Sequence, residues 1–180
     1  MLLRENVTKT NNIKMLTNKE VKNLLELDKI LLHPNKVIDL KKEKNKIELI
    51  SQQDTQRKFL VEITSSKKIV LKTSIHHMET VSNIGLLRID YRGNHHNPVE
   101  IKATLPHKLK KYADKWFSED EPHMHIYVEG YKPLSWAIPL SDTEFATQNL
   151  KEKSDIVDLI NNFAKEINLT DNLKIQTSIN

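Results

Sequence analysis

The sequence has no cysteine, only three glycines among 180 residues, and no long apolar run. Without cysteine, the chain cannot form disulfides, zinc ribbons, iron–sulfur clusters or a thiol nucleophile. The few, scattered glycines exclude the phosphate-binding loops of P-loop and Rossmann proteins, which need several glycines close together. No run approaches the roughly 18 apolar residues of a membrane span, and the N-terminus does not resemble a signal peptide. We therefore expect a soluble, cytoplasmic protein with no membrane partner.

The chain also has little excess charge of either sign: 28 Lys and Arg nearly balance 24 Asp and Glu, which leaves a net charge of +4. This modest excess permits nucleic-acid binding but does not indicate it. Hydrophobic residues make up 38% of the chain and charged residues 29%, which argues against extensive disorder. The length fits one domain, and we expect a flexible arm over 1–15, an α+β domain over 16–172 and a tail over 173–180.

The middle of the chain is predicted to be β. Alternating β-branched residues indicate strands over 46–51, 57–64, 68–75, 86–92 and 124–129, with an edge strand over 136–140. Short polar turns join the first three strands, which is typical of an antiparallel meander with one face on a core. His76 and His77 would end the third strand, where exposed histidines are expected.

Helices are expected in four places. Capping boxes or apolar residues at helical spacing indicate them over about 18–32, after Pro106 through a core-facing Trp116 and Phe117, after Ser141, and over 156–167. The order of elements predicts an α+β fold, in which an antiparallel meander sheet has helices packed on one face and helical elements at both ends.

Histidines are concentrated in one part of the chain, and five of the eight lie between positions 95 and 125. Side chains alternate along a strand, so His123, His125 and Tyr127 would share one face. By the same alternation, Arg88 and Asp90 would share a face of the 86–92 strand. If these strands are neighbours, the five side chains form one polar cluster, with His95 and His96 at its end.

Three interpretations of this cluster compete. In the first, it holds a divalent transition metal, with His95, His123 and His125 as ligands and His96 or Asp90 able to complete the set. In the second, no metal is needed: one imidazole takes the 2′-hydroxyl proton of RNA, and another protonates the leaving oxygen. In the third, the histidines bond to the backbone and to each other and have only a structural role.

A family resemblance rests on the residues of the cluster. The order R-x-D, G, H-x-N-P, P-H-x-H-x-Y runs through Arg88, Gly93, His95 and Pro122 to Tyr127. Over about residues 84–168 the chain resembles an uncharacterised domain family of bacteria and mobile elements. More distantly, the spacing is similar to that of TumE-type toxins of toxin–antitoxin pairs. That resemblance implies a ribonuclease, with RNA as substrate and a cognate antitoxin as partner.

The sequence thus predicts a toxin-like endoribonuclease of a mobile element or phage. Its site residues would be His96, His123 and His125 as acid/base groups or ligands, Arg88 holding phosphate, Asp90 orienting an imidazole, and Tyr127 donating to a phosphoryl oxygen. The alternative is a non-enzymatic inhibitor or binding module that acts on a host defence protein or nucleic acid. Beyond a divalent metal no cofactor is expected, and a homodimer is compatible with either hypothesis.

Overall fold

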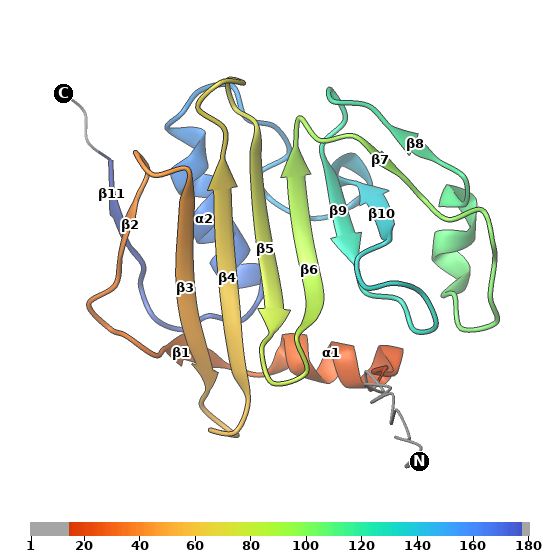
Figure 1. Cartoon of the computed structure of the whole chain (residues 1–180), viewed down its shortest axis with the longest axis horizontal. Helices are drawn as coiled ribbons and strands as arrows, with labels where there is room; N and C mark the ends of the chain where they lie inside the picture. Colours follow the sequence, from red (N-terminus) through yellow and green to blue (C-terminus); the bar gives the residue numbers. More distant parts are fainter. Residues whose placement is uncertain (1–14, 178–180) are drawn as a thin grey trace, which may run out of the picture.

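The computed structural model in Figure 1 describes residues 15–177 and has one large antiparallel sheet at its centre. Its seven strands follow the order β1-β3-β4-β5-β6-β9-β10. They are β1 (Lys29–Leu31), β3 (Lys44–Ser51), β4 (Lys58–Ser65), β5 (Thr73–Glu79), β6 (Ile84–Tyr91), β9 (His123–Ile126) and β10 (Trp136–Pro139). The meander β3-β4-β5-β6 confirms the predicted α+β class and its antiparallel sheet.

Two small sheets and a few helical segments complete the described chain. The small sheets pair β2 (Val37–Asp39) with β11 (Lys174–Gln176), and β7 (His95–His96) with β8 (Trp116–Phe117). The helical segments are α1 (Asn18–Glu26), α2 (Asp155–Glu166) and the 3₁₀ turns η1 (His107–Tyr112) and η2 (Leu140–Asp142). Strand β11 lies within the predicted tail, and the predicted arm lies outside the described residues except for Met15. Within residues 15–177, no helix has the length and apolar character needed to cross a membrane.

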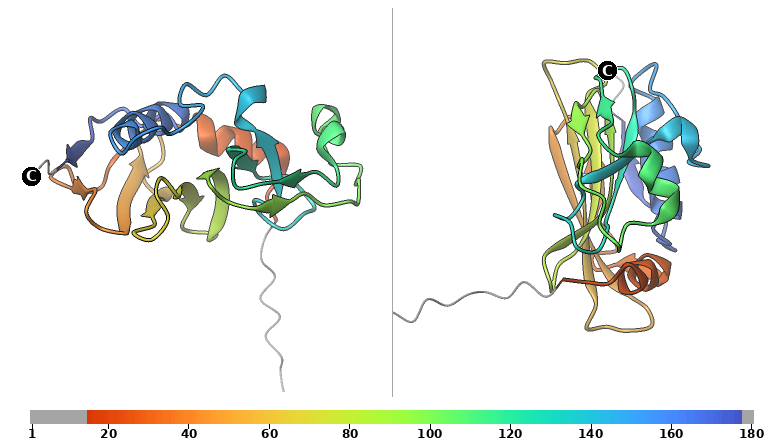
Figure 2. Two further views of the ribbon diagram at one scale, coloured as in Figure 1. Left: turned by 90° about the horizontal axis from the view of Figure 1, so that it is seen from above. Right: turned by 90° about the vertical axis from the view of Figure 1, so that its right-hand side faces the viewer.

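One face of the sheet, called here the core face, packs against the helices. Alternate residues of the strands, such as Leu49, Phe59 and Ile89, are almost fully buried there. They form one apolar cluster with Leu159 and Phe163 of α2, which lies along this side of the sheet (Figure 2). A smaller apolar cluster joins η1 to β10 around the buried Trp136. The helical segments therefore cover one face, as the sequence predicts.

The opposite, outer face differs along the sheet. Over β3 and β4 it is exposed and carries charged pairs such as Lys44 with Glu62. Over β9 and β10 it is covered by the β7–β8 ribbon, whose Phe117 is 1% exposed and packs against His123 of β9. The ribbon is fastened to the edge strand β10 by Asn97, whose side-chain amide donates to the Ala137 carbonyl and accepts from the Ala137 N–H. This amide pairs with the edge of β10 as a neighbouring strand would. It holds the ribbon in place, and the ribbon shields part of the outer face from water.

The histidine pair on β5 is placed differently from the prediction. The third strand begins at Thr73 rather than at residue 68 and continues to Glu79, so both histidines lie inside it. His77 points to the core face, is fully buried and stacks on Phe59 with 5.3 Å between ring centroids. The expectation of an exposed pair is therefore wrong for His77, because the strand is shifted toward the C-terminus.

Two of the helix predictions are also wrong. The stretch after Pro106 forms only the 3₁₀ turn η1, and Ser141 lies inside the 3₁₀ turn η2, after which the described chain has no helix before α2. Trp116 lies in β8 with 68% of its surface exposed, not in a core-facing helical stripe. Trp116 pairs in register with His96, so tertiary strand pairing overrides the local helical spacing. At the N-terminus, the first helix ends at Glu26 because the chain continues into β1.

A buried lysine ties the two α-helices together. Lys29 is 0% exposed, and its ammonium donates to the carbonyls of Leu25, Leu27 and Ile167, at 3.1, 2.8 and 2.9 Å. These carbonyls lie at the C-terminal ends of α1 and α2, where no intrahelical donor remains for them. One side chain thus satisfies the ends of two helices that are far apart in the sequence.

Replacing this ammonium with a methyl group of similar reach should destabilise the fold. We expect Lys29→Met to lower the free energy of unfolding by about 2–4 kcal/mol, because buried carbonyls lose their donor. Urea denaturation followed by circular dichroism measures the change. The control is Lys22→Met on α1, whose side chain is 73% exposed and which should change stability by less than about 0.5 kcal/mol. Equal stabilities of the two variants would contradict this role of Lys29.

The same lysine should make stability depend on pH. Burial lowers the pKa of Lys29 from its usual 10.5 to about 8. Between these pH values the unfolded chain holds a proton that the folded chain has lost, so the free energy of unfolding increases with pH. Relative to Lys29→Met, the wild type should gain up to about 3 kcal/mol across this range. A constant difference between the two proteins from pH 7.5 to 10.5 would refute the shift.

Candidate metal centre

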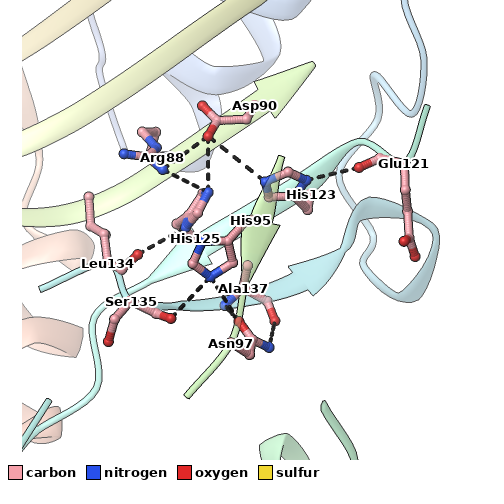
Figure 3. A network of polar contacts seen from close by, with 10 residues as sticks. All are labelled: Arg88, Asp90, His95, Asn97, Glu121, His123, His125, Leu134, Ser135 and Ala137. Atoms are coloured by element: carbon pink, nitrogen blue, oxygen red, sulfur yellow. Dashed lines mark hydrogen bonds and ion pairs between the residues drawn. The ribbon is translucent and has the colours of Figure 1, made fainter. Parts of the chain in front are cut away.

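The polar cluster on the outer face is created by the pairing of β6 with β9. The antiparallel register places Arg88 opposite His125 and Asp90 opposite His123. Figure 3 shows the four side chains turned toward one another beneath the β7–β8 ribbon. His123 and His125 are 0% exposed, whereas the Arg88 and Asp90 side chains are 34% and 14% exposed. The cluster is therefore dry on the β9 side and partly open on the β6 side.

Backbone carbonyls fix the protonation of both buried imidazoles. Nδ1 of His123 lies 2.9 Å from the Glu121 carbonyl, and Nδ1 of His125 lies 2.9 Å from the Leu134 carbonyl. A carbonyl only accepts, so each Nδ1 carries the hydrogen and donates it. In a neutral imidazole, the Nε2 atom then carries a lone pair and no hydrogen. The Nε2 lone pairs of both histidines point toward the Asp90 carboxylate.

Three lone-pair donors converge at this point. Oδ2 of Asp90 lies 3.0 Å from Nε2 of His125 and 3.9 Å from Nε2 of His123. All three ligand atoms lie within 4.8 Å of one another. The buried Nε2 of His123 has no hydrogen-bond partner among residues 15–177. Ligand atoms of a tetrahedral zinc site are about 3.3 Å apart for bonds of about 2.0 Å, so these distances bracket the geometry that a metal ion would require.

Lone pairs that face one another repel unless a cation contacts them, and here that cation is the guanidinium of Arg88. Its Nη2 atom lies 2.8 Å from Nε2 of His125 and 3.0 Å from Oδ2 of Asp90. The guanidinium therefore satisfies two of the three converging atoms but not His123. A metal ion in contact with all three atoms would satisfy the complete set.

The electrostatics keep Asp90 and His123 in their metal-binding forms. Burial raises the pKa of Asp90, but the hydrogen bond that His125 donates when its Nε2 atom is protonated, together with the charge of Arg88, outweighs burial and holds the pKa well below its usual range. Burial lowers the pKa of His123. At neutral pH the carboxyl is thus ionised and His123 is neutral, which are the protonation states in which these groups bind metals.

His95 covers the cluster without joining the three ligand atoms. Its ring centroid lies 4.4 Å from that of His125 and 5.9 Å from that of His123. Its Nε2 atom lies 3.0 Å from Oδ1 of Asn97 and 3.1 Å from the Ser135 carbonyl, so this nitrogen donates to both. Burial, together with the neighbouring His125, lowers the pKa of His95 to about 4. In the structure Asp90 takes the place that the predicted metal set gave to His95.

Two predicted site residues lie away from the cluster. His96 follows His95 on β7 and points to the other side of the ribbon, where it stacks on Trp116 and contacts Asp114 at 2.7 Å. Tyr127 follows the end of β9, and its buried hydroxyl donates to the Leu16 carbonyl at 2.8 Å. Strand alternation ends at Ile126, so Tyr127 does not share the face of His125. The structure thus groups Arg88, Asp90, His123 and His125.

Sequence reasoning missed two supports of the cluster. Gly85 on β6 leaves room for Leu134, because an added Cβ would lie 2.7 Å from the Leu134 Cδ1 atom. Leu134 itself has a left-handed backbone with φ of 58°, an uncommon conformation for leucine, and its carbonyl receives the His125 hydrogen bond. A further residue near the cluster is His76, which pairs with Arg88 across β5 and β6 and whose Nε2 atom has no hydrogen-bond partner in the described part of the chain. Its only sequence signal was the His-His pair.

A cavity of about 540 Å³ opens beside the cluster on the outer face. Arg88 and Asp90 line it, together with Ser74 and residues of the β4–β5 loop such as Lys72. Because Arg88 and Asp90 belong to both the cavity and the buried cluster, a ligand in the cavity would meet the cluster at these two side chains.

Comparisons with known proteins give one match. The model of a family of unknown function, DUF6978, matches residues 16–169. The searches of curated proteins and of solved structures gave no match. The matched range includes the whole sheet of seven strands, the β7–β8 ribbon and every residue of the cluster, which agrees with the predicted resemblance to an uncharacterised domain family. The chain therefore belongs to the family of unknown function DUF6978.

Proposed function

We propose that this chain is a metal-dependent phosphodiesterase whose substrate is RNA, consistent with a toxin-like endoribonuclease. The observation that carries the proposal is the convergence of Asp90 Oδ2, His123 Nε2 and His125 Nε2 within 4.8 Å. Two imidazoles and one carboxylate form the protein ligand set of hydrolytic zinc sites, which leave a further position for water. The RNA substrate is supported by the cationic Arg88 at the cavity and by the likeness to ribonuclease toxins.

The surroundings of the ligands support a metal rather than an acid/base role for the imidazoles. Metal-binding histidines usually donate their second N–H to a carbonyl or carboxylate, as His123 and His125 do. A general acid near neutral pH needs an imidazole that is protonated part of the time. Burial lowers the pKa of His95 to about 4 and also lowers the pKa of His123. These two imidazoles are therefore weaker candidates for a general acid, and the N–H groups that His123 and His125 donate to carbonyls favour a metal.

Each residue then has a defined task in diester hydrolysis. Asp90, His123 and His125 would hold the metal ion, which would supply an acidified water as the nucleophile. Arg88 would hold and neutralise the non-bridging phosphate oxygens at the mouth of the cavity. Hydrolysis would form the bond between the water oxygen and phosphorus, break the bond to the leaving oxygen, and pass the proton lost by the water to that oxygen. The β7–β8 ribbon excludes bulk water from the ligands, which strengthens these interactions.

Metal analysis tests the ligand set directly. Protein prepared without chelator and saturated with Zn²⁺ should hold about one ion per chain, and EDTA should stop the hydrolysis of a fluorescent RNA. Asp90→Asn and His123→Gln, which keep polar side chains in the cluster, should each weaken zinc binding by at least about 100-fold, measured with a competing chromogenic chelator. His96→Gln, on the other side of the ribbon, is the control and should bind as the wild type. Unchanged zinc affinity in both ligand variants would refute the site.

Arg88 separates metal binding from catalysis. Its guanidinium competes with a cation at Asp90 and His125, so Arg88→Met should leave zinc affinity unchanged or increase it. The same variant should lower kcat/KM for bis(4-nitrophenyl) phosphate by about 10²–10³-fold, because a positioned donor to the phosphate is lost. Arg57→Met, in the turn between β3 and β4, should leave both quantities unchanged. Full activity in Arg88→Met would exclude Arg88 as the phosphate holder.

A further inference from the structure

A second cavity adjoins the one beside the metal cluster. It has a volume of about 630 Å³ and lies where the β2–β3 turn, the β4–β5 loop and the start of α2 come together. These segments meet at the end of the sheet where β4 and β6 finish (Figure 1). The two cavities share five lining residues, namely Glu43, Ser65, Ser66, Lys72 and Thr73. The two cavities therefore adjoin at these residues, and together they are called the groove.

The groove turns around the end of the sheet. Its first half is lined by Arg88 and Asp90 on the outer face. Its second half reaches Ile156 and Val157 at the start of α2, on the core side of the sheet. A straight, stiff duplex cannot follow such a turn, whereas a flexible single strand can.

The charge of the groove is strongly positive. Six cationic side chains line it against the two carboxylates of Glu43 and Asp90; they are Lys41, Lys42, Lys67, Lys72, Lys153 and Arg88. None of the five lysines forms an ion pair with any residue in the range 15–177, whereas Lys44 and Lys46 on the neighbouring sheet face both pair with Glu62. These lysines therefore keep their charge available for an anionic ligand.

Apolar side chains lie among the lysines in the second half of the groove. Leu40, Val70 and Leu71 line it, and Val70 is 67% exposed on the β4–β5 loop. Single-stranded nucleic acids bind in grooves that offer cations to the phosphates and apolar or aromatic surface to the bases. The groove has both kinds of surface, and it ends at the proposed catalytic cluster.

We infer that this groove binds single-stranded RNA and leads its backbone from the start of α2 over the β4–β5 loop to Arg88 and Asp90. The inference rests on the proposed function, because it names the form of RNA that would reach the metal cluster. It adds a substrate class, single-stranded RNA several nucleotides long, and assigns phosphate contacts to Lys67, Lys72 and Lys153.

Binding of a 5′-fluorescein-labelled 12-nucleotide oligouridylate, followed by fluorescence anisotropy in EDTA, tests the groove without any need for metal or cleavage. The triple variant Lys67→Gln/Lys72→Gln/Lys153→Gln should bind at least about tenfold more weakly at 0.1 M salt. The slope of log K against log[salt] should become shallower by about 2, since each lost phosphate contact contributes about 0.7 for a single strand.

The control has the same loss of charge elsewhere: Lys19→Gln/Lys22→Gln/Lys132→Gln removes three exposed lysines that do not line the groove. It should bind the oligonucleotide within twofold of the wild type, and circular dichroism should show that both triple variants are folded. Equal weakening in the two variants, or no weakening in either, would overturn the groove. Equal or tighter binding of a 12-base-pair RNA duplex would overturn the choice of a single strand. Because the assay contains EDTA, a failed zinc or hydrolysis experiment leaves its outcome unaffected.

Discussion

The register between β6 and β9 is the constraint on which the rest of the site depends. It sets Arg88 opposite His125 and Asp90 opposite His123 on one face, and Ile89 opposite Met124 on the other. A shift of β9 by one residue would turn His123 and His125 into the apolar core and Met124 to the outer face. Burying polar groups without hydrogen-bond partners costs roughly 1–3 kcal/mol each. Both faces therefore select the same register, and the ligand atoms converge as a consequence.

The segment between these two strands supplies the cover. Residues 92–122 leave β6, form the β7–β8 ribbon and η1, and return as β9, so that one insertion wraps around the edge strand β10. Asn97 is its central contact: its amide bonds to both backbone groups of Ala137, to the Tyr112 carbonyl, and to His95. The asparagine of the H-x-N-P motif thus holds the ribbon on the sheet edge and sets the His95 ring over the cluster.

The β6 side of the cluster has a different character. Arg88 and Asp90 remain partly exposed and line the cavity, whereas His123 and His125 are fully enclosed. Imidazole ligands that are shielded from water lie beside a solvent-accessible, cationic groove. The proposed metal-assisted hydrolysis requires this arrangement, since the metal must be held rigidly while the substrate enters and leaves. The turn of the groove around the sheet end is produced by the β4–β5 loop, where Leu71 adopts a left-handed backbone with φ of 60°.

The sequence by itself determined the α+β class, the meander and the placement of Arg88 with Asp90 and of His123 with His125 on one strand face, because side-chain alternation within a strand is a local property. That these two strands are neighbours was decided by the tertiary structure. Only the tertiary structure decided where alternation stops and what covers each face. It separates His96 from His95, ends β9 before Tyr127, exposes Trp116 and buries His77, each through pairing with a distant strand. It also makes Asp90 the third converging ligand and joins two cavities into a lysine-lined groove. Contacts between residues on different strands and loops create these features, and no pattern along the chain gives the distances between those residues.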